Sequence, residues 1–260
     1  MKIGIIGDGA IGRYVSQKLT EKALTPSVRL VRPARLKAAK DCKIPQVGHV
    51  GDLPGDISLM IDCAGHSALL EHGPSILKRG ISLISVSLGA LADKELEQRL
   101  TVTAKEGGAQ LHLATGAIGA LDCLQAARVG GLSSVTYVGR KPPKGWQGSK
   151  AEETLDLSNL EEPAVHFHGS ARDAAMNYPK NANVAAAVAI AGIGFDETAV
   201  QLIADPSVTA NIHEINAVGE FGQFHFRIEG KALPDNPKSS ALAAMSVISS
   251  IERRNSLITI

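Results

Sequence analysis

The sequence has few aromatic residues and almost no charge imbalance. Only 3% of its 260 residues are Phe, Trp or Tyr, and the formal net charge is +1. Nucleic-acid-binding surfaces carry a basic excess, and single strands are held by stacking on aromatic rings. The composition therefore argues against nucleic acid as the main ligand. The apolar runs are short and broken by glycine or charge, so no membrane span is predicted.

Cysteine is also scarce. Cys42, Cys63 and Cys123 are the only three, and no two of them form a CxxC pair. An odd number without close spacing argues against a disulfide framework and favours a reducing compartment. The chain begins directly with a strand pattern, without a cationic segment and a cleavage site, so no signal peptide is predicted. We therefore expect a cytoplasmic protein whose thiols are small packing residues.

Apolar residues are plentiful, at 44% of the chain, which is enough for a sizeable core. The first half alternates short apolar runs with helical patterns. KIGIIG (2–7) precedes YVSQKLTEKA (14–23), and SLMIDCAG (58–65) precedes ALLEHGPSILKRG (68–80). This β-α rhythm predicts an α/β fold in which helices cover both faces of a parallel sheet.

The second half has a different pattern. Strand-like segments lie close together at 133–143, 161–170, 200–208, 213–220 and 222–230, and an alanine-rich stretch at 181–194 is typical of a buried helix. This predicts an α+β domain with a mostly antiparallel sheet. We expect three parts: a dinucleotide-binding domain at 1–115, a catalytic and dimerisation domain at 116–238, and a C-terminal helix at 239–260. The helix has a broad apolar stripe and should pack on the first domain.

The opening segment contains the pattern GxGxxG, from Gly7 through Asp8, Gly9, Ala10 and Ile11 to Gly12. It follows a predicted strand, precedes a predicted helix and begins a β-α-β series, which makes it far more specific than an isolated glycine motif. Gly7 permits the tight turn, Gly9 lets the backbone approach a pyrophosphate, and Gly12 lets helix and strand pack closely. The pattern predicts a Rossmann domain, with Ala10 and Ile11 in the phosphate-binding loop.

The next strand ends at SVRLVRPAR (27–35), where an NAD-binding domain often has an acidic residue for the ribose hydroxyls. Here Arg32 occupies that place. An arginine attracts a 2′-phosphate, which a carboxylate would repel, so NADP should be accepted alongside NAD. The alternative is a solvated arginine, with NAD held by other contacts. A further strand ends at Cys63 and Ala64, which should line the cofactor because ligands bind beyond the carboxyl ends of parallel strands.

Four other stretches place polar groups beside glycine or proline turns: ATGAIGALD (114–122), GSARDAAMNYPKNANVAAA (169–187), NIHEINAVGEFG (211–222) and LPDNPKSSALAA (233–244). Together with GxGxxG, and in this order, they resemble the L-aspartate dehydrogenase family over nearly the whole chain. The resemblance implies NAD(P)-dependent oxidation of L-aspartate, through iminoaspartate, to oxaloacetate and ammonia. It also implies a homodimer and a role in supplying NAD synthesis.

The resemblance assigns roles to three residues. The histidine of NIHEI is the family's active-site residue, here His213, and Ala117 and Asn183 contact the cofactor. The reaction itself calls for such a histidine, because the substrate ammonium must lose a proton before hydride transfer and water must later attack the imine. A histidine titrates near neutral pH and can act as acid and base. The alternative is a structural histidine.

The two substrate carboxylates need cationic or N–H partners. Lys238 beside Ser239 is the first candidate, with Asn183 assisting; Arg140 and Lys141 come second. His166 and His168 alternate on one strand, but no third ligand at suitable spacing points to a metal. Two other functions stay open: a cyclic-imine reductase of the dihydrodipicolinate reductase type, and a non-catalytic NADP-sensing regulator.

Overall fold

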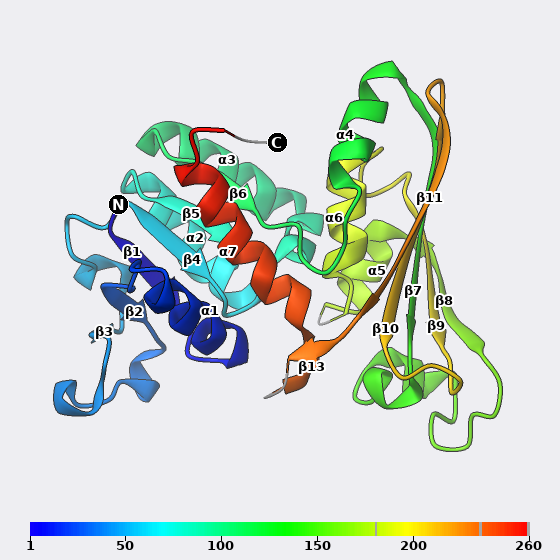
Figure 1. Ribbon diagram of the computed structural model, residues 1–260, viewed down its shortest axis with the longest axis horizontal. Helices are drawn as coiled ribbons and strands as arrows, with labels where there is room; N and C mark the ends of the chain where they lie inside the picture. Colours follow the sequence, from blue (N-terminus) through cyan, green and yellow to red (C-terminus); the bar gives the residue numbers. More distant parts are fainter. Residues whose placement is uncertain (180, 234–235, 259–260) are drawn as a thin grey trace. The chain divides into compact units, whose positions relative to one another are not determined.

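The computed structural model describes residues 1–179, 181–233 and 236–258, and for 236–238 it describes the backbone only. It divides into two compact units (Figure 1). Unit 1 comprises residues 1–114 and 244–260, and unit 2 comprises residues 115–243. These divisions fall within a few residues of the predicted boundaries, whereas the roles assigned to the parts stay predictions.

Unit 1 is built on a six-stranded parallel sheet, as the β-α rhythm predicted. The strand order is β3-β2-β1-β4-β5-β6. The strands are β1 (Ile3–Ile6), β2 (Val28–Leu30), β3 (Gln46–Val47), β4 (Leu59–Asp62), β5 (Ser82–Ser85) and β6 (Leu111–Leu113). Chain order reverses at β1, and this is the point at which ligands bind in open parallel sheets. The short β3 escaped prediction because two residues carry no periodic signal.

Helices α1 (Ala10–Glu21), α2 (His66–Lys78), α3 (Lys94–Gly107) and α7 (Ala241–Asn255) pack around this sheet. The 3₁₀ turns η1 (Pro33–Arg35), η2 (Ala39–Asp41) and η3 (Val50–Asp52) lie between β2 and β4, and η4 (Leu88–Ala92) lies between β5 and α3. The C-terminal helix α7 contributes Val247, Ile248 and Ile251 to the core around β1 and β4. Met245 on the same helix is 46% exposed while Ala244 beside it is buried, so the apolar stripe of α7 is narrower than the sequence predicts.

Unit 2 has a five-stranded sheet of order β11-β10-β7-β9-β8. Its strands are β7 (Leu132–Lys141), β8 (Ala164–Ser170), β9 (Ala199–Ala204), β10 (Asn211–Gly219) and β11 (Gly222–Gly230). Only the β7–β9 pair is parallel, so the prediction of a mostly antiparallel sheet is confirmed. A two-stranded ribbon of β12 (Ala232–Leu233) and β13 (Asn236–Ser240) precedes α7.

Three helices pack against one face of this sheet: α4 (Leu121–Gly130), α5 (Ala171–Asn177) and α6 (Asn183–Ala191) (Figure 1). Helix α6 is almost entirely alanine and valine and is buried on most sides, as its composition predicted. The small side chains of α6 let it lie close to the sheet. At its C-terminal end, a Cβ on Gly192 would be 3.4 Å from a methyl group of Val135 on β7, which shows how close the two elements are. The turns η5 (Pro143–Trp146) and η6 (Lys150–Glu153) follow β7.

No helix among the described residues is long and apolar enough to cross a membrane.

Candidate functional site

The glycine-rich loop between β1 and α1 has the geometry that its spacing predicts. Gly7 has φ +95°, which a side chain would strain, and a Cβ on Gly12 would lie 2.9 Å from the Gly7 carbonyl oxygen. Gly9 is the N-cap of α1, and a Cβ there would meet nothing within 4 Å. The loop thus places the free N–H groups of a helix N-terminus beside open space, which is where a phosphate group binds.

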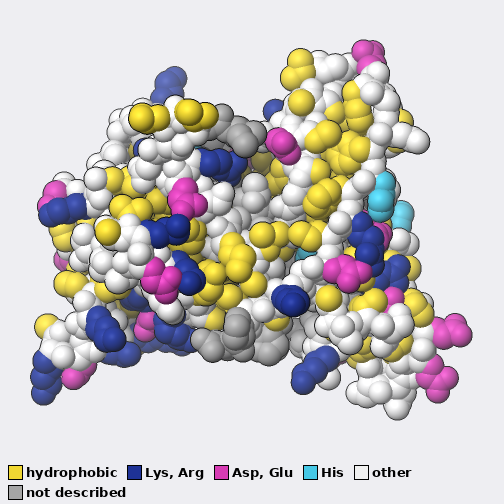
Figure 2. All heavy atoms as spheres, viewed as in Figure 1, with side chains coloured by type: hydrophobic (Ala, Val, Ile, Leu, Met, Phe, Trp, Pro, Cys, Tyr) yellow, Lys and Arg dark blue, Asp and Glu magenta, His cyan; other side chains and the backbone are white. Residues whose placement is uncertain are grey.

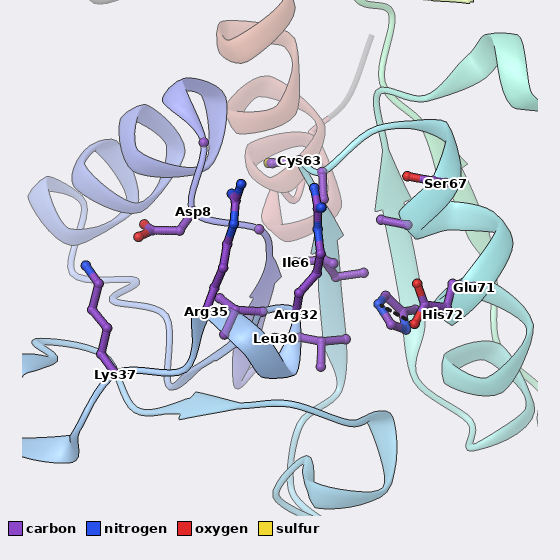
Figure 3. A pocket seen from close by; sticks show the side chains of 15 residues that line it. Ile6, Asp8, Leu30, Arg32, Arg35, Lys37, Cys63, Ser67, Glu71 and His72 are labelled. Carbon is purple, nitrogen blue, oxygen red and sulfur yellow. Dashed lines mark ion pairs between the residues drawn. The ribbon is translucent and has the colours of Figure 1, made fainter.

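A cavity of about 520 Å³ adjoins this loop (Figure 3). Five of the predicted cofactor residues line it: Gly7, Gly9, Arg32, Cys63 and Ala64. Ala10, Ile11 and Gly12 lie in the first turn of α1 and are not part of the cavity wall. Gly12 is buried and acts through packing, as its small size requires.

Cationic side chains form one end of the cavity. Arg32 and Arg35 extend in the same direction, toward the glycine-rich loop, and Lys37 follows on the same segment (Figure 3). Lys and Arg side chains also gather on the surface over the segment that joins β2 to β3, at the lower left of Figure 2. This end of the cavity can therefore hold an anion, and three adjacent cations suit a doubly charged phosphate better than one arginine would.

Two buried side chains near the cavity were missed in the sequence. Arg29, on β2, hydrogen-bonds Ser16 Oγ at 2.7 Å and the Gly7 carbonyl oxygen at 3.2 Å, and it pairs with Asp8. Asp62, at the end of β4, accepts hydrogen bonds from Ser85 Oγ at 2.7 Å, from Ser87 Oγ at 2.7 Å and from Ala64 N at 2.9 Å.

These buried groups brace the loops that hold the cavity. Burial raises the pKa of the Asp62 carboxyl, and the hydrogen bonds from Ser85, Ala64 and Ser87 oppose that rise. Arg29 could have been suspected because a charged residue stands inside the apolar run SVRLV, where only a paired cation is tolerated.

In unit 2, the sheet register brings His213 beside Tyr137. His213 of β10 lies directly opposite Gly139 of β7, and it is only 3% exposed. The Tyr137 hydroxyl lies 2.8 Å from His213 Nδ1. A Cβ on Gly139 would come within 2.7 Å of that hydroxyl. Gly139 therefore leaves the space through which Tyr137 reaches the imidazole, which is a role that no sequence pattern indicated.

The environment of His213 changes its chemistry. Burial, followed by the positive charge of Lys141, lowers the pKa of His213 to about 3. The expectation that this histidine titrates near neutral pH is therefore wrong for the free protein, because a buried imidazole loses the hydration that favours its charged form. Burial also raises the pKa of the Tyr137 hydroxyl, so that it stays protonated. Both groups are neutral at physiological pH.

Lys141 is the last residue of β7, the strand that carries Tyr137. Its Nζ donates to Asn181 Oδ1 at 2.8 Å and lies 4.7 Å from the centre of the Trp146 ring. Burial lowers the pKa of Lys141 to about 8. Among the described residues no carboxylate pairs with this amine. A lysine with this pKa is partly neutral near physiological pH and can then accept a proton, whereas an ordinary surface lysine is almost fully protonated there.

His166 belongs to the same cluster. Its Nδ1 lies 3.1 Å from the Tyr178 hydroxyl, its ring packs edge-on against Trp146, and its buried Nε2 has no partner among the described side chains. Burial, then Lys141, lowers its pKa to about 4. His168 is exposed rather than on the same buried face, because a register shift between Val165 and Phe167 interrupts the strand alternation. No group of three potential metal ligands occurs among the described residues.

The other predicted residues are placed as follows. Ala117 is buried in the segment between β6 and α4, and Asn183 is the first residue of α6, so both belong to unit 2. Ser239 lies on β13, not at a helix start, because α7 begins at Ala241. The side chain of Lys238 is outside the described part of the chain. Arg140 is paired with Asp205 at 2.6 Å.

The residues present fit a dinucleotide. The glycine-rich loop, the open space at Gly9 and the cationic end of the cavity match the pyrophosphate and adenosine ends of such a cofactor. The parallel sheet with its glycine-rich loop places unit 1 in the class of dinucleotide-binding domains, and unit 2 adds buried histidine, tyrosine and lysine side chains that can transfer protons.

Comparison with known proteins identifies the family. Residues 7–114 match the family model described as homoserine dehydrogenase, NAD binding domain, and residues 122–254 match the one described as aspartate dehydrogenase, C-terminal. The chain belongs to the L-aspartate dehydrogenase family. The first unit is its NAD(P)-binding domain, and the resemblance found in the sequence is confirmed.

Relatives and a solved structure agree with this assignment. The chain is 49% identical over 259 residues to an L-aspartate dehydrogenase from Ruegeria pomeroyi, covering 99% of this chain and 94% of that protein. It is 43% identical over 267 residues to one from Cupriavidus necator, with complete coverage of both. The crystal structure of an aspartate dehydrogenase from Thermotoga maritima has a TM-score of 0.79 and 28% identity, covering 100% of this chain and 99% of that one.

Proposed function

We propose that this protein oxidises L-aspartate with NAD+ or NADP+ to iminoaspartate, which water converts to oxaloacetate and ammonia. The observation that carries the proposal is the 49% identity to an L-aspartate dehydrogenase over 99% of the chain. It favours this activity over the two alternatives, an imine reductase and a non-catalytic NADP sensor. A buried acid–base cluster in the second unit also argues against a sensor, which needs none.

We propose His213 as the proton-transfer residue at the imine. Bound aspartate brings two carboxylates, and negative charge beside a buried imidazole raises its pKa toward the ordinary value. His213 could then exchange protons with the attacking water while Tyr137 hydrogen-bonds Nδ1. Glu214, the neighbouring carboxylate, points to the other side of the strand, where it accepts a hydrogen bond from Arg227 at 3.1 Å, which leaves the histidine as the candidate.

The nicotinamide ring, when bound, accepts the hydride from the substrate Cα. Gly7 and Gly9 would hold the pyrophosphate, and Arg32 the adenosine ribose, where its charge supports NADP as well as NAD. Ala117 and Asn183 stay proposed cofactor contacts. Lys238, Ser239 and Asn183 stay proposed partners of the substrate carboxylates.

The proposal includes a homodimer and a role of the reaction in supplying NAD synthesis. Both rest on the family resemblance. A cytoplasmic location is supported by the described thiols of Cys42, Cys63 and Cys123, which are all free.

Steady-state rates test the activity directly. We expect reduced cofactor to accumulate with L-aspartate, and to be consumed with oxaloacetate plus ammonia; D-aspartate and L-glutamate, assayed in parallel, measure how selective the site is. Cofactor binding without turnover of any amino acid would contradict the proposal and favour the sensor. Turnover of a cyclic imine in place of iminoaspartate would favour the reductase.

A further inference from the structure

The buried cluster in unit 2 contains two more nitrogen-containing side chains that can accept a proton besides His213. His213, His166 and Lys141 come from three strands, and the charge of Lys141 acts on both imidazoles. His166 Nε2 is buried without a partner among the described side chains, and the only hydrogen bond of the Lys141 amine to a described residue is to Asn181. An unpartnered nitrogen atom in a buried cluster, here His166 Nε2, indicates a ligand, because such groups are otherwise paired.

The hydrogen bond from Tyr137 determines whether His213 has a free lone pair to accept a proton from the substrate ammonium. The Tyr137 hydroxyl is buried, and His213 Nδ1 is its only hydrogen-bond partner among the described residues. A buried hydroxyl hydrogen requires an acceptor, and Nδ1 is the acceptor that the Tyr137 hydroxyl has among the described residues, so we assign the hydroxyl as the donor. The imidazole hydrogen then sits on Nε2. In the free protein, His213 therefore offers a donor and no lone pair to a substrate ammonium.

We propose that Lys141 is a second catalytic residue, whose amine accepts the proton that the substrate ammonium loses before hydride transfer. This assignment rests on the proposed function. An N–H bond of the ammonium breaks and an N–H bond forms at Lys141 Nζ, which leaves the substrate as a neutral amine. The amine lone pair then forms the C=N bond as the hydride leaves Cα for the oxidised cofactor.

The surroundings of Lys141 allow this role. The amine contacts Asn181 and the Trp146 ring, and its charge acts on His213 of β10 and His166 of β8. None of them carries a negative charge. The carboxylate at the end of the neighbouring strand β9, Asp205, is neutralised by Arg140.

This environment favours the neutral amine and brings its pKa to about 8. Asn181 holds the amine in place through a carbonyl oxygen, which accepts a hydrogen bond without adding charge. A substrate that presents an ammonium therefore meets a base that can take its proton near physiological pH.

The experiment compares Lys141→Met, Lys141→Arg and Lys141→Ala with Lys144→Met, an exposed lysine three residues away. We expect kcat for L-aspartate oxidation to fall by about 100- to 10,000-fold in the first three variants and not in the control. Arginine should fail as methionine does, because a guanidinium stays protonated. The wild-type rise of kcat/KM with pH through about 8 should disappear. Added methylamine should restore turnover to Lys141→Ala, and cofactor affinity should be unchanged throughout.

Turnover by Lys141→Arg at the wild-type level would overturn the proposal and make Lys141 a cationic anchor for a carboxylate. A retained acid limb in Lys141→Met would overturn it as well. If the wild type and Lys144→Met oxidise L-aspartate but the Lys141 variants do not show the expected losses, only the Lys141 assignment is wrong. If the wild type does not oxidise L-aspartate, the proposed function is wrong.

Reductive methylation at a series of pH values measures the neutral fraction of the Lys141 amine independently of turnover. Half-maximal labelling near pH 8 supports the assignment, and half-maximal labelling near the ordinary lysine pKa contradicts it.

Discussion

The two units build their polar sites in opposite ways. In unit 1 the site is open and made largely of backbone: a glycine-rich loop, a helix N-terminus and flexible exposed arginines around a cavity. In unit 2 the site is closed and made of side chains: His213, Tyr137, Lys141 and His166 are held by strand register and hydrogen bonds. A backbone site binds a charged cofactor without chemistry of its own, whereas buried side chains have altered proton affinities and can carry out proton transfer.

The largest effect should come from the closed site. His213→Ala should lower kcat for L-aspartate oxidation by about 100- to 10,000-fold, the usual contribution of a positioned acid–base group. His213→Asn should fail similarly, because an amide keeps hydrogen bonding but takes up no proton. The measurement is kcat against pH for both variants. Wild-type turnover with an unchanged pH profile in either one would make His213 structural.

The core of unit 1 gives the next effect, on stability. Ile251 of α7 is fully buried in the cluster around β1 and β4. Ile251→Ala should lower the free energy of unfolding by about 2–5 kcal/mol, through lost burial and the cavity left behind. Met245→Ala on the same helix is the control, since that side chain is 46% exposed and should change it by less than about 0.5 kcal/mol. Equal losses in chemical denaturation would show that α7 packs differently.

The cationic end of the open site should control the choice of cofactor. Arg32→Asp should lower the ratio of kcat/KM for NADP+ to that for NAD+ by about 10- to 100-fold, because a carboxylate repels the 2′-phosphate. Lys40→Asp, outside the cavity, makes the same charge change at an exposed position and should leave the ratio unaltered. If Arg32→Asp also leaves it unaltered, Arg32 is only a solvated surface residue.

The closed site should also make the protein sensitive to acid. His213 is neutral in the folded state down to about pH 3 but is protonated in the unfolded chain below about 6.5. The unfolded state binds the extra proton, so stability is lost as the pH falls from 6.5 toward 3, by about 1.4 kcal/mol per pH unit. His213→Gln should reduce this slope, whereas His168→Gln, at an exposed position, should not. Equal slopes in wild type and His213→Gln, from denaturant titrations between pH 4 and 6.5, would contradict the low pKa.

The same contrast explains how much the sequence could predict. Gly7, Gly9 and Gly12 lie within six residues of the chain and form a turn set by local backbone geometry, so their spacing alone predicted the loop between β1 and α1. That this loop binds the cofactor stays a prediction. The parallel order of unit 1 likewise follows from the β-α rhythm. A two-residue strand such as β3 has no pattern to detect, and the short helices α4 and α5 were not predicted either.

The closed site could not be assembled from the sequence in this way. His213 was found by resemblance, but its contact with Tyr137 depends on the pairing of β10 with β7, and the two residues are 76 positions apart. The low pKa values of His213 and Lys141 depend on burial, which no local pattern reveals. The sequence suggested Lys141 only as a second partner of the substrate carboxylates; that it follows Tyr137 and Gly139 at strand period two also indicates that it shares their face.

The division of labour between the two sites is tested most directly by measuring cofactor affinity and kcat together for two variants. Gly9→Val fills the open space beside the loop without meeting protein atoms within 4 Å of its Cβ, so it should weaken NADP+ binding by about tenfold or more while the protein stays folded. His213→Ala should bind NADP+ as the wild type does and lose turnover. If His213→Ala loses cofactor affinity as Gly9→Val does, or if Gly9→Val binds NADP+ normally, the two sites do not divide binding and proton transfer as described.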